Sequence, residues 1–474
     1  MTLSGLDWAV VAAYFALTMS VGLFMGRFVK GSGDFFSGGK KVPWWMGAIS
    51  SYMAMISSFV FIAHGGVAYT DGIVAIVVFW SCAFAVLAGT WVFAGRWRRA
   101  NVDTPMEYLE RRYGAWVRQF ISWCGVAFRI LDNMVRLYTL GLMASVLTGV
   151  SVETGLWIGC AVVLAYTLAG GLWSVLVTDM IQCTILLGVS IVVLPMSIGA
   201  AGGLAELQAR LPEHFNPFNG HRGEFLFLAA YYLMVFIKYN ANWAFIQRLA
   251  SVPTARDARK MSVLTSALLF VFPVVALLPA ICARALLPGV NPEESYMRLC
   301  GRLLPSGALG LMVSAMLAAT LSTLASEFNV TSSVLAKDVY ERLWRPHAGE
   351  REKLVVARCA TLLVAALVAV GAAYVKALGG AFEANKILMG LVGVPIVIPS
   401  VFGILWKRPN SKGVFLCVAM GVGFGAAALF VDSLSWQVKT LAQIAVSFAG
   451  YFGGALLGTS KKERESKEAL FDEL

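Results

Sequence analysis

Four hydroxyl side chains interrupt an apolar stretch of membrane length at residues 310–338. They are Thr320, Ser322, Thr323 and Ser326. The last three fall close together, so in a helix their side chains share roughly one face. Hydroxyl and carbonyl oxygens are ligands that suit a dehydrated alkali cation. The pattern allows two interpretations, a cation site or a close helix contact in which each hydroxyl bonds to a carbonyl one turn earlier.

Charged side chains occur in a second apolar stretch. Arg129, Asp132 and Arg136 are spaced by three and four residues, which places them on one helical face. Charges in such a stretch cannot face lipid, so they must pair inside the protein. The partner is a neighbour on the same helix, as in an Asp132–Arg136 bridge, a group on another helix, or a bound substrate.

Lys238 and Asp179 are charges in two further apolar stretches. Lys238 lies near the middle of its stretch, where an ammonium needs a partner. It binds a carboxylate of the substrate, pairs with Asp132, or extends along a water path without a specific role. Asp179 lies toward one end of its stretch, where a salt bridge with an arginine of a loop would satisfy it.

The composition indicates which elements position these residues. Of the 474 residues, 58% are hydrophobic and 14% are charged, and the mean hydropathy is +0.73. Soluble domains carry about a quarter charged residues, so we predict an all-α integral membrane protein. About thirteen apolar runs are long enough to cross ~30 Å of hydrocarbon. They are residues 6–28, 45–69, 73–95, 119–147, 153–170, 175–200, 225–247, 262–287, 305–335, 355–376, 384–406, 412–431 and 437–458.

The basic residues are distributed unevenly among the loops. If the N-terminus lies outside, cytoplasmic loops and the tail hold 27 of the 38 Lys and Arg residues. This distribution follows the positive-inside rule and predicts an external N-terminus and a cytoplasmic C-terminus in the cell membrane. The net charge of +11 therefore reports topology, and we predict no nucleic-acid partner.

No arrangement of residues typical of an enzyme is present in the sequence. There is no P-loop, GxSxG or HExxH motif, and three of the four histidines lie in loops. The eight cysteines show no CxxC or His-Cys spacing, which predicts neither a disulfide framework nor a metal centre. We expect no catalytic residues, no organic cofactor and no metal other than Na⁺.

The order of the runs predicts one domain, residues 1–474, with internal symmetry. A first helix at 6–28 precedes two groups of five spans, at 40–200 and 224–408. Because five is odd, the second group enters the membrane from the opposite side, as inverted repeats require. Two last helices at 411–458 and a cytoplasmic tail at 459–474, either a solvated helix or a disordered end, follow.

The first helices of the two groups are both irregular. The run at 45–69 contains four serines and a His-Gly-Gly sequence, and the run at 225–247 contains Lys238, Asn240 and Asn242. We predict that both helices are broken, since unwound backbone near the midplane offers free N–H and C=O groups to substrate and ion.

Five segments in this order resemble the sodium:solute symporter family. They are KKVPWWMGAISSYMAMISSFVFIAHGGVAYTDG at 40–72, GGLWSVLVTDMIQ at 170–182, IQRLASVPTARDARK at 246–260, LAATLSTLASEFNVTSSVLAKD at 317–338 and GLVGVPIVIPSVFGILWKRPNSKG at 390–413. The resemblance extends nearly from end to end. It implies the LeuT-type fold of two inverted five-helix repeats and sodium-coupled uptake of a small organic solute.

The resemblance also implies site residues. The family's sodium site corresponds to the carbonyls of Met53, Ile56 and Ala319 and the hydroxyls of Ser322 and Thr323. A second sodium position found in some members would use Asp179, Ser322 and Ser326, but Ala325 lacks the hydroxyl that those members have there.

Substrate contacts are predicted less sharply. The candidates are Ser57, Val60, His64, Phe79, Asp132, Arg136, Lys238 and Asn242. Val60 and Phe79 stand where galactose-type members have polar sugar contacts, so the chain departs from the sugar pattern. An amino acid, an organic acid or a carboxylated sugar fits the charged lining better than a neutral hexose.

The expected function is therefore sodium-coupled symport of a small polar organic solute by alternating access. The alternatives are a proton-coupled transporter of the same fold, with Asp179 or His64 as the titrating group, a solute sensor that does not transport, and a channel. We expect the lipid bilayer, sodium and the solute as partners, and a monomer or weak oligomer.

Overall fold

The computed structural model describes residues 3–26, 38–102, 105–169, 172–431 and 433–473. Within these ranges the chain is helical and contains no strand. The fold class predicted from composition is thereby confirmed for the described residues.

The first half of the chain forms helices from α1 to α10. They are α1 (Gly5–Gly26), α3 (Trp44–Met55), the π-helical turn η2 (Val60–His64), α4 (Gly65–Asp71), α5 (Val74–Gly89), η3 (Thr90–Ala94), α6 (Gly95–Arg99), α7 (Pro105–Tyr113), α8 (Ala115–Thr148), α9 (Val152–Ala169) and α10 (Leu172–Ala200). Segments η2 to α4 and α5 to α6 each run on without a break, although a π turn lies inside both.

The second half continues to α22. Its helices are α11 (Leu204–Arg210), α12 (Phe225–Asn240), α13 (Trp243–Ser251), α14 (Ala255–Leu286), η6 (Pro292–Glu294), α15 (Ser295–Leu303), α16 (Ala308–Ser333), η7 (Val334–Trp344), α17 (Glu350–Ala372), α18 (Ala381–Leu388), η9 (Met389–Gly393), α19 (Val394–Phe402), α20 (Ser411–Leu429), α21 (Trp436–Gly453) and α22 (Lys461–Glu473). Every predicted apolar run overlaps one of these helices or a chain of them.

Fewer helices than the predicted thirteen meet the length and composition of a membrane span. Among the described residues, eight helices do so, or nine if the bent pair Trp44–Met55 and Val60–Asp71 counts as one span. Apolar helices at 5–21, 152–164 and 225–240 are shorter. One reason is that some runs that are continuous in hydropathy are divided into two shorter helices, as at the interruption after Asn240. The number thirteen and the five-plus-five layout therefore stay predictions.

Both helices predicted to be irregular are interrupted. After α3 the chain is extended at Ile56, with φ −106° and ψ 131°, and the two parts of the run meet at 58°. After α12 the chain is extended at Asn242, whose side-chain oxygen accepts a hydrogen bond of 2.9 Å from the backbone N–H of Phe245. Asn242 is thus the N-cap of α13, and the substrate contact predicted for it would compete with this bond.

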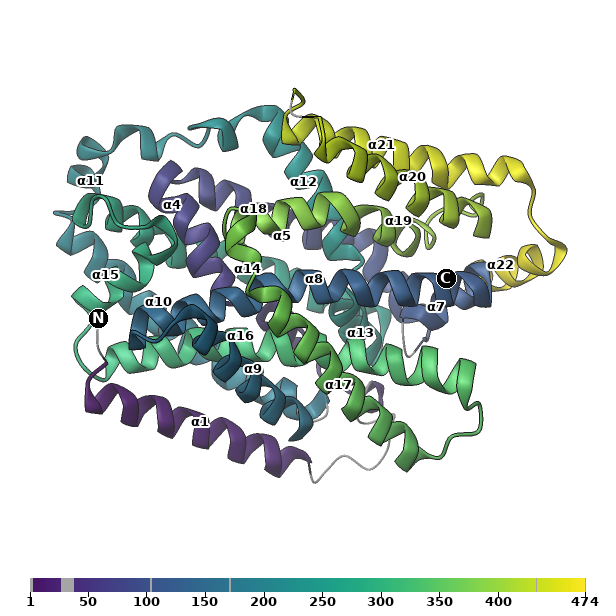
Figure 1. Ribbon diagram of the computed structural model, residues 1–474, viewed down its shortest axis with the longest axis horizontal. Coiled ribbons are helices and arrows are strands. Elements are labelled where there is room, and N and C mark those ends of the chain that lie inside the picture. Colours follow the sequence, from purple (N-terminus) through teal and green to yellow (C-terminus); the bar gives the residue numbers. More distant parts are fainter. Residues whose placement is uncertain (1–2, 27–37, 103–104, 170–171, 432, 474) are drawn as a thin grey trace.

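Helix α16 lies in the middle of the bundle. It packs against α1, α3, α8, α9, α10 and α17. In the apolar part of the continuous helix 308–344, 83% of the residues are buried inside the protein. Most long helices run along the long axis of the molecule, with α11 and α15 near one end and α7 and α22 near the other (Figure 1). The N- and C-termini lie toward opposite ends.

The C-terminal segment forms a helix, which was one of the two predicted alternatives, but one side of this helix is docked on the bundle. Helix α22 packs against α7, and its Leu470 is only 1% exposed. The carboxylate of Glu463 accepts hydrogen bonds from the N–H and the hydroxyl of Ser411, at 2.8 and 3.0 Å. The apolar side chain at 470 interrupts a strongly charged segment, and its burial explains the docking.

Candidate functional site

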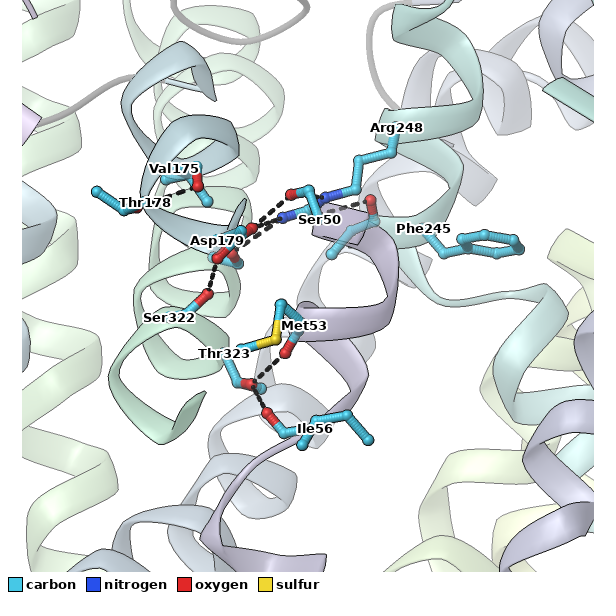
Figure 2. A network of polar contacts seen from close by, with 12 residues as sticks. Ser50, Met53, Ile56, Val175, Thr178, Asp179, Phe245, Arg248, Ser322 and Thr323 are labelled. Carbon is cyan, nitrogen blue, oxygen red and sulfur yellow. Dashed lines mark hydrogen bonds and ion pairs between the residues drawn. The ribbon is translucent and has the colours of Figure 1, made fainter. Parts of the chain in front are cut away.

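An oxygen cluster forms where α16 passes the interruption after α3. The Thr323 hydroxyl oxygen lies 3.2 Å from the Met53 carbonyl, 2.7 Å from the Ile56 carbonyl and 2.9 Å from the Ala319 carbonyl (Figure 2 shows the first two contacts). A hydroxyl has one proton and can donate to only one of these carbonyls at a time. Oxygen lone pairs therefore outnumber donors at this point, which is the arrangement that a bound cation would satisfy.

The interruption itself creates the cluster. Because α3 ends at Met55, the Ile56 carbonyl lies outside the regular helical pattern, and the Met53 carbonyl accepts a 3.2 Å bond from the N–H of Ile56, three residues on, in place of one from four residues on. The unwound chain is held in place by the neighbouring helices, since the Ser58 N–H donates to the Thr320 hydroxyl at 2.8 Å and the Ser58 hydroxyl lies 2.8 Å from that of Thr139. Thr320 thus has a packing role, whereas Thr323 faces the carbonyls.

Ser322 points to a different partner. Its hydroxyl donates to the carboxylate of Asp179, which also accepts a 2.5 Å bond from Ser50 (Figure 2). The structure therefore brings together four of the five predicted sodium-site residues, and places the fifth beside them on Asp179. Ser322, Thr323 and Asp179 are each no more than 1% exposed.

Arg248 of α13 lies where the second sodium was predicted. Its Nη2 atom is 3.7 Å from the Asp179 carboxylate and 3.3 Å from the Ser326 hydroxyl, and its Nε donates to Ser50 at 2.8 Å (Figure 2 labels Arg248, Asp179 and Ser50). The guanidinium is 1% exposed. A fixed positive charge therefore already neutralises Asp179, as the salt-bridge interpretation predicted, although the arginine comes from a helix and not from a loop.

The three charges of α8 divide between two partners. Arg129 forms an ion pair with Glu327 of α16 and lies over the ring of Trp243, with Cζ 4.3 Å from the ring centroid. Asp132 instead bonds to Arg136 at 2.8 Å and to Lys238 of α12 at 3.2 Å. Both pairings considered for Asp132 thus occur together.

Asp132 carries one negative charge but faces two positively charged side chains. One carboxylate faces the guanidinium of Arg136 and the ammonium of Lys238, and the Asn385 amide of α18 lies 3.5 Å away. These charged side chains are between 10% and 16% exposed. The group carries one surplus positive charge, which is costly in a membrane interior unless an anion compensates it.

His64 lies in an aromatic group that also contacts α18. Its ring makes edge contacts with Phe59, Phe79 and Phe382 at centroid distances of 5.5, 5.2 and 5.6 Å. Its Nδ1 is buried without a hydrogen-bond partner among the described residues. Phe382 and Asn385 are three residues apart on α18 and share a face, so this helix connects the His64 group to the Asp132 group.

The other predicted substrate residues line the first interruption. Ser57 is 4% exposed, and its hydroxyl accepts a 3.3 Å bond from the Phe59 N–H. Val60 is 2% exposed and begins the π-helical turn. Both thus lie in the same short segment as His64.

Sequence reasoning missed several residues of this core. Arg248 lies just beyond the predicted run 225–247, and Glu327 carries no motif, although a carboxylate inside an apolar run is itself a signal. Asn385 and Phe382 carry no motif, and only the packing of α18 on α8 and η2 shows their place. Ser50 was noted as an irregularity but not as a partner of Asp179.

These features define a helical membrane transporter of the broken-helix class, with a cation-type oxygen cluster at the first interruption. The chain belongs to the sodium:solute symporter family, whose profile matches residues 35–421. The fold is of the LeuT type.

Curated relatives cover most of the chain. The sodium/mannose cotransporter SLC5A10 of Bos taurus is 27% identical over 91% of this chain and 80% of its own length. The sodium/glucose cotransporter of Vibrio parahaemolyticus is 26% identical over 93% of this chain and 88% of its own length. The protein is therefore a multi-pass, sodium-coupled solute symporter and not an enzyme.

Solved structures share the fold. A Na⁺-coupled sialic acid symporter in a substrate-bound outward-open state superimposes with a TM-score of 0.85 at 21% identity, covering 96% of this chain and 98% of that one. Mhp1, a nucleobase-cation-symport-1 family transporter, gives a TM-score of 0.53 at 13% identity, covering 93% and 98%.

Proposed function

We propose that this symporter binds its coupling Na⁺ with the carbonyls of Met53, Ile56 and Ala319 and the hydroxyl of Thr323. The oxygen excess around Thr323 is the observation that carries the proposal. Ser322 would complete the set by turning from Asp179 to the ion. The site joins α3 to α16, so Na⁺ can favour one conformation to the extent that it binds that conformation more tightly.

We propose a stoichiometry of one sodium ion. The position of the second ion, between Asp179 and Ser326, is bounded by the guanidinium of Arg248. A second cation there would approach an existing positive charge inside a low-dielectric core. Two ions remain the alternative if Arg248 leaves this position during the transport cycle.

The solute site proposed lies between the Asp132 group and the His64 group, joined by α18. The surplus positive charge of Arg136 and Lys238 favours a solute with a carboxylate, which would pair with Lys238 while Asp132 keeps Arg136. The aromatic rings around His64 would cover its less polar part. A small organic acid, an amino acid or a carboxylated sugar meets these requirements.

Alternating access follows from the proposed layout of inverted repeats at 40–200 and 224–408. The two interrupted helices begin these repeats and both contact the core. The proposed orientation has the N-terminus outside and the C-terminus in the cytoplasm, in the cell or inner membrane. Helices α7 and α22, near the basic segments, lie together at one end of the bundle (Figure 1).

A two-stage experiment tests this function. A thermal-shift screen of the purified protein against small organic solutes, in sodium and in potassium, identifies a ligand whose binding needs sodium. Uptake of that ligand into proteoliposomes is then measured under a sodium gradient. Thr323→Val removes the hydroxyl at nearly constant volume, and it should raise the sodium concentration for half-maximal uptake about tenfold or more.

Ser314→Ala is the matched control. Ser314 is also buried in α16, but among the described residues its hydroxyl bonds only to the Gly310 carbonyl of its own helix. Its loss should leave the sodium dependence unchanged. Equal sodium dependence in Thr323→Val and wild type would refute the site, and uptake that follows a pH gradient without sodium would establish the proton-coupled alternative.

A further inference from the structure

A cavity apart from the sodium and solute groups is lined by residues of α7, α8, α20 and α22. Helices α7 and α22 occupy one end of the bundle (Figure 1). The cavity has a volume of about 810 Å³ and is open to the surface. Its walls come from the end of α7, the start of α8, η7, the start of α20 and α22. Nothing in the transport mechanism uses this cavity.

Three helices begin at its wall. Helix α8 begins at Ala115, α20 at Ser411 and α22 at Lys461, and the cavity is lined by Gly114 to Trp116, Ser411 and Ser460. The first N–H groups of a helix carry partial positive charge and lack partners within the helix. Side chains cap α20, but none caps α8. The start of α8 therefore offers donors to an anion.

A buried arginine at the wall is incompletely paired. Arg112 has no exposed surface, and its Nε and Nη2 donate to carbonyls of residues 403, 406, 407 and 409 at 2.8 to 3.4 Å. Its Nη1 has no hydrogen-bond partner among the described residues, and its Cζ lies 4.4 Å from the ring centroid of Tyr113 and 5.5 Å from that of Phe471. The guanidinium thus keeps one N–H group that an anion could accept from.

The carboxylates of the cavity are already engaged. Glu110 bonds to Arg118 and to Arg342, and these cations keep the pKa of Glu110 below its usual value although burial alone would raise it. Both oxygens of Glu463 bond to Ser411. The hydrogen bonds of these two carboxylates therefore go to groups other than Arg112 and the first N–H groups of α8.

The rim of the cavity is aromatic and exposed. Trp116 is 84% exposed and Phe415 is 37% exposed, on the two helices α8 and α20. Exposed tryptophan is typical of the membrane interface, where basic pockets between transmembrane helices hold lipid headgroups. The cavity thus combines an anion-binding base with a rim suited to acyl chains.

We propose that this cavity binds a phosphate-type anion, and that the anion is the headgroup phosphate of an anionic lipid. Bound there, the lipid contacts α7, α8, α20 and α22 at once. It holds the C-terminal helix against the bundle beside the contact between Ser466 and the Arg111 carbonyl, which measures 2.7 Å.

The experiment uses the full-length protein in neutral detergent. Phosphatidylglycerol and phosphatidylcholine with equal acyl chains are titrated separately, and retained lipid is counted by native mass spectrometry. Inorganic phosphate is titrated in parallel, with the thermal midpoint as readout. Wild type should retain phosphatidylglycerol in preference to phosphatidylcholine.

Two arginines three residues apart give a matched pair. Arg342 lines the cavity and Arg345 does not, and their side chains are 54% and 64% exposed. Arg342→Gln should weaken phosphatidylglycerol binding about fivefold, the effect of one basic residue near a membrane surface, whereas Arg345→Gln should have little effect. In Arg342→Gln, Glu110 still forms its ion pair with Arg118. A thermal midpoint equal to that of wild type in the absence of lipid would show that the variant is folded.

Trp116→Ala separates the two sources of the anion. It should weaken the binding of phosphatidylglycerol and leave the binding of inorganic phosphate unchanged. If only inorganic phosphate binds and Arg342→Gln weakens it, the anion site stands and the lipid is ruled out. Equal retention of both lipids without phosphate binding overturns the proposal, as does an equal loss in both arginine variants. None of these measurements depends on transport, so their outcome is independent of whether the proposed function is correct.

Discussion

At the scale of residues, the sequence predicted the oxygen cluster better than it predicted the charges. The resemblance predicts five residues for a sodium site, and the carbonyls of three of them surround the hydroxyl of the fourth, Thr323. Hydroxyl type and backbone position are local properties, so a motif can carry them. Charge pairing depends on which helices pack together, and Arg248 reaches Asp179 only because α13 lies against α3.

The Asp179–Arg248 pair predicts both sodium stoichiometry and stability. With one sodium, the Hill coefficient for sodium should be near one in wild type and in Asp179→Asn, measured by uptake. A wild-type coefficient near two that falls in the variant would restore the second ion. Arg248→Met leaves Asp179 buried and unpaired, and should destabilise the protein by about 3–5 kcal/mol.

Chemical denaturation of single and double variants checks the pairing of Asp179 with Arg248. The double variant Asp179→Leu with Arg248→Met should lose less stability than the sum of the singles, since residues in contact deviate from additivity by about 0.5–3 kcal/mol. Additive losses would show that the two groups do not interact.

Lys238 tests the charge of the solute. Lys238→Met removes the surplus positive charge and leaves the Asp132–Arg136 bridge. It should abolish binding of a carboxylate ligand while a neutral amide analogue, weak in wild type, binds no worse. Thermal shift measures both ligands, and exposed Lys376→Met serves as the control. If the affinity for the carboxylate ligand is unchanged, Lys238 does not bind the solute and has only a structural role through its bond to Asp132.

At the scale of elements, hydropathy located the helices but not their interruptions in detail. The runs at 45–69 and 225–247 were predicted to be broken from their serine, glycine and asparagine content, and both are. The π turns at η3 and η7 were not predicted, since no residue pattern in 90–94 or 334–344 marks them. The many charged residues of α22 predict a solvated segment, but the side chain of Leu470 is buried against the rest of the protein.

Asn242 belongs to this scale, because its side chain caps α13. Asn242→Asp keeps an acceptor for the Phe245 N–H, and Asn242→Ala removes it. The alanine variant should lose about 0.5–2 kcal/mol of stability, and the aspartate variant much less, by thermal or chemical denaturation. If Asn242 instead contacts the solute, Asn242→Ala would reduce solute affinity with little change in stability.

At the scale of the whole molecule, the buried charges that α8, α10, α12, α13 and α16 bring together give one overall charge balance. Arg129 with Glu327 and Arg248 with Asp179 are neutral pairs, whereas Asp132 faces both Arg136 and Lys238. The surplus of one is matched by a solute monoanion, and the entering Na⁺ adds one positive charge. The charge moved in each cycle follows from these proposals together.

One Na⁺ with one monoanionic solute makes transport electroneutral. Uptake into proteoliposomes clamped with potassium and valinomycin should then be the same at 0 and −100 mV. A single net charge is worth about 2.3 kcal/mol at 100 mV, close to a fiftyfold change in the accumulation ratio. Such a change would mean a second sodium or a zwitterionic solute. The Hill coefficient separates these two cases, because only the first raises it above one.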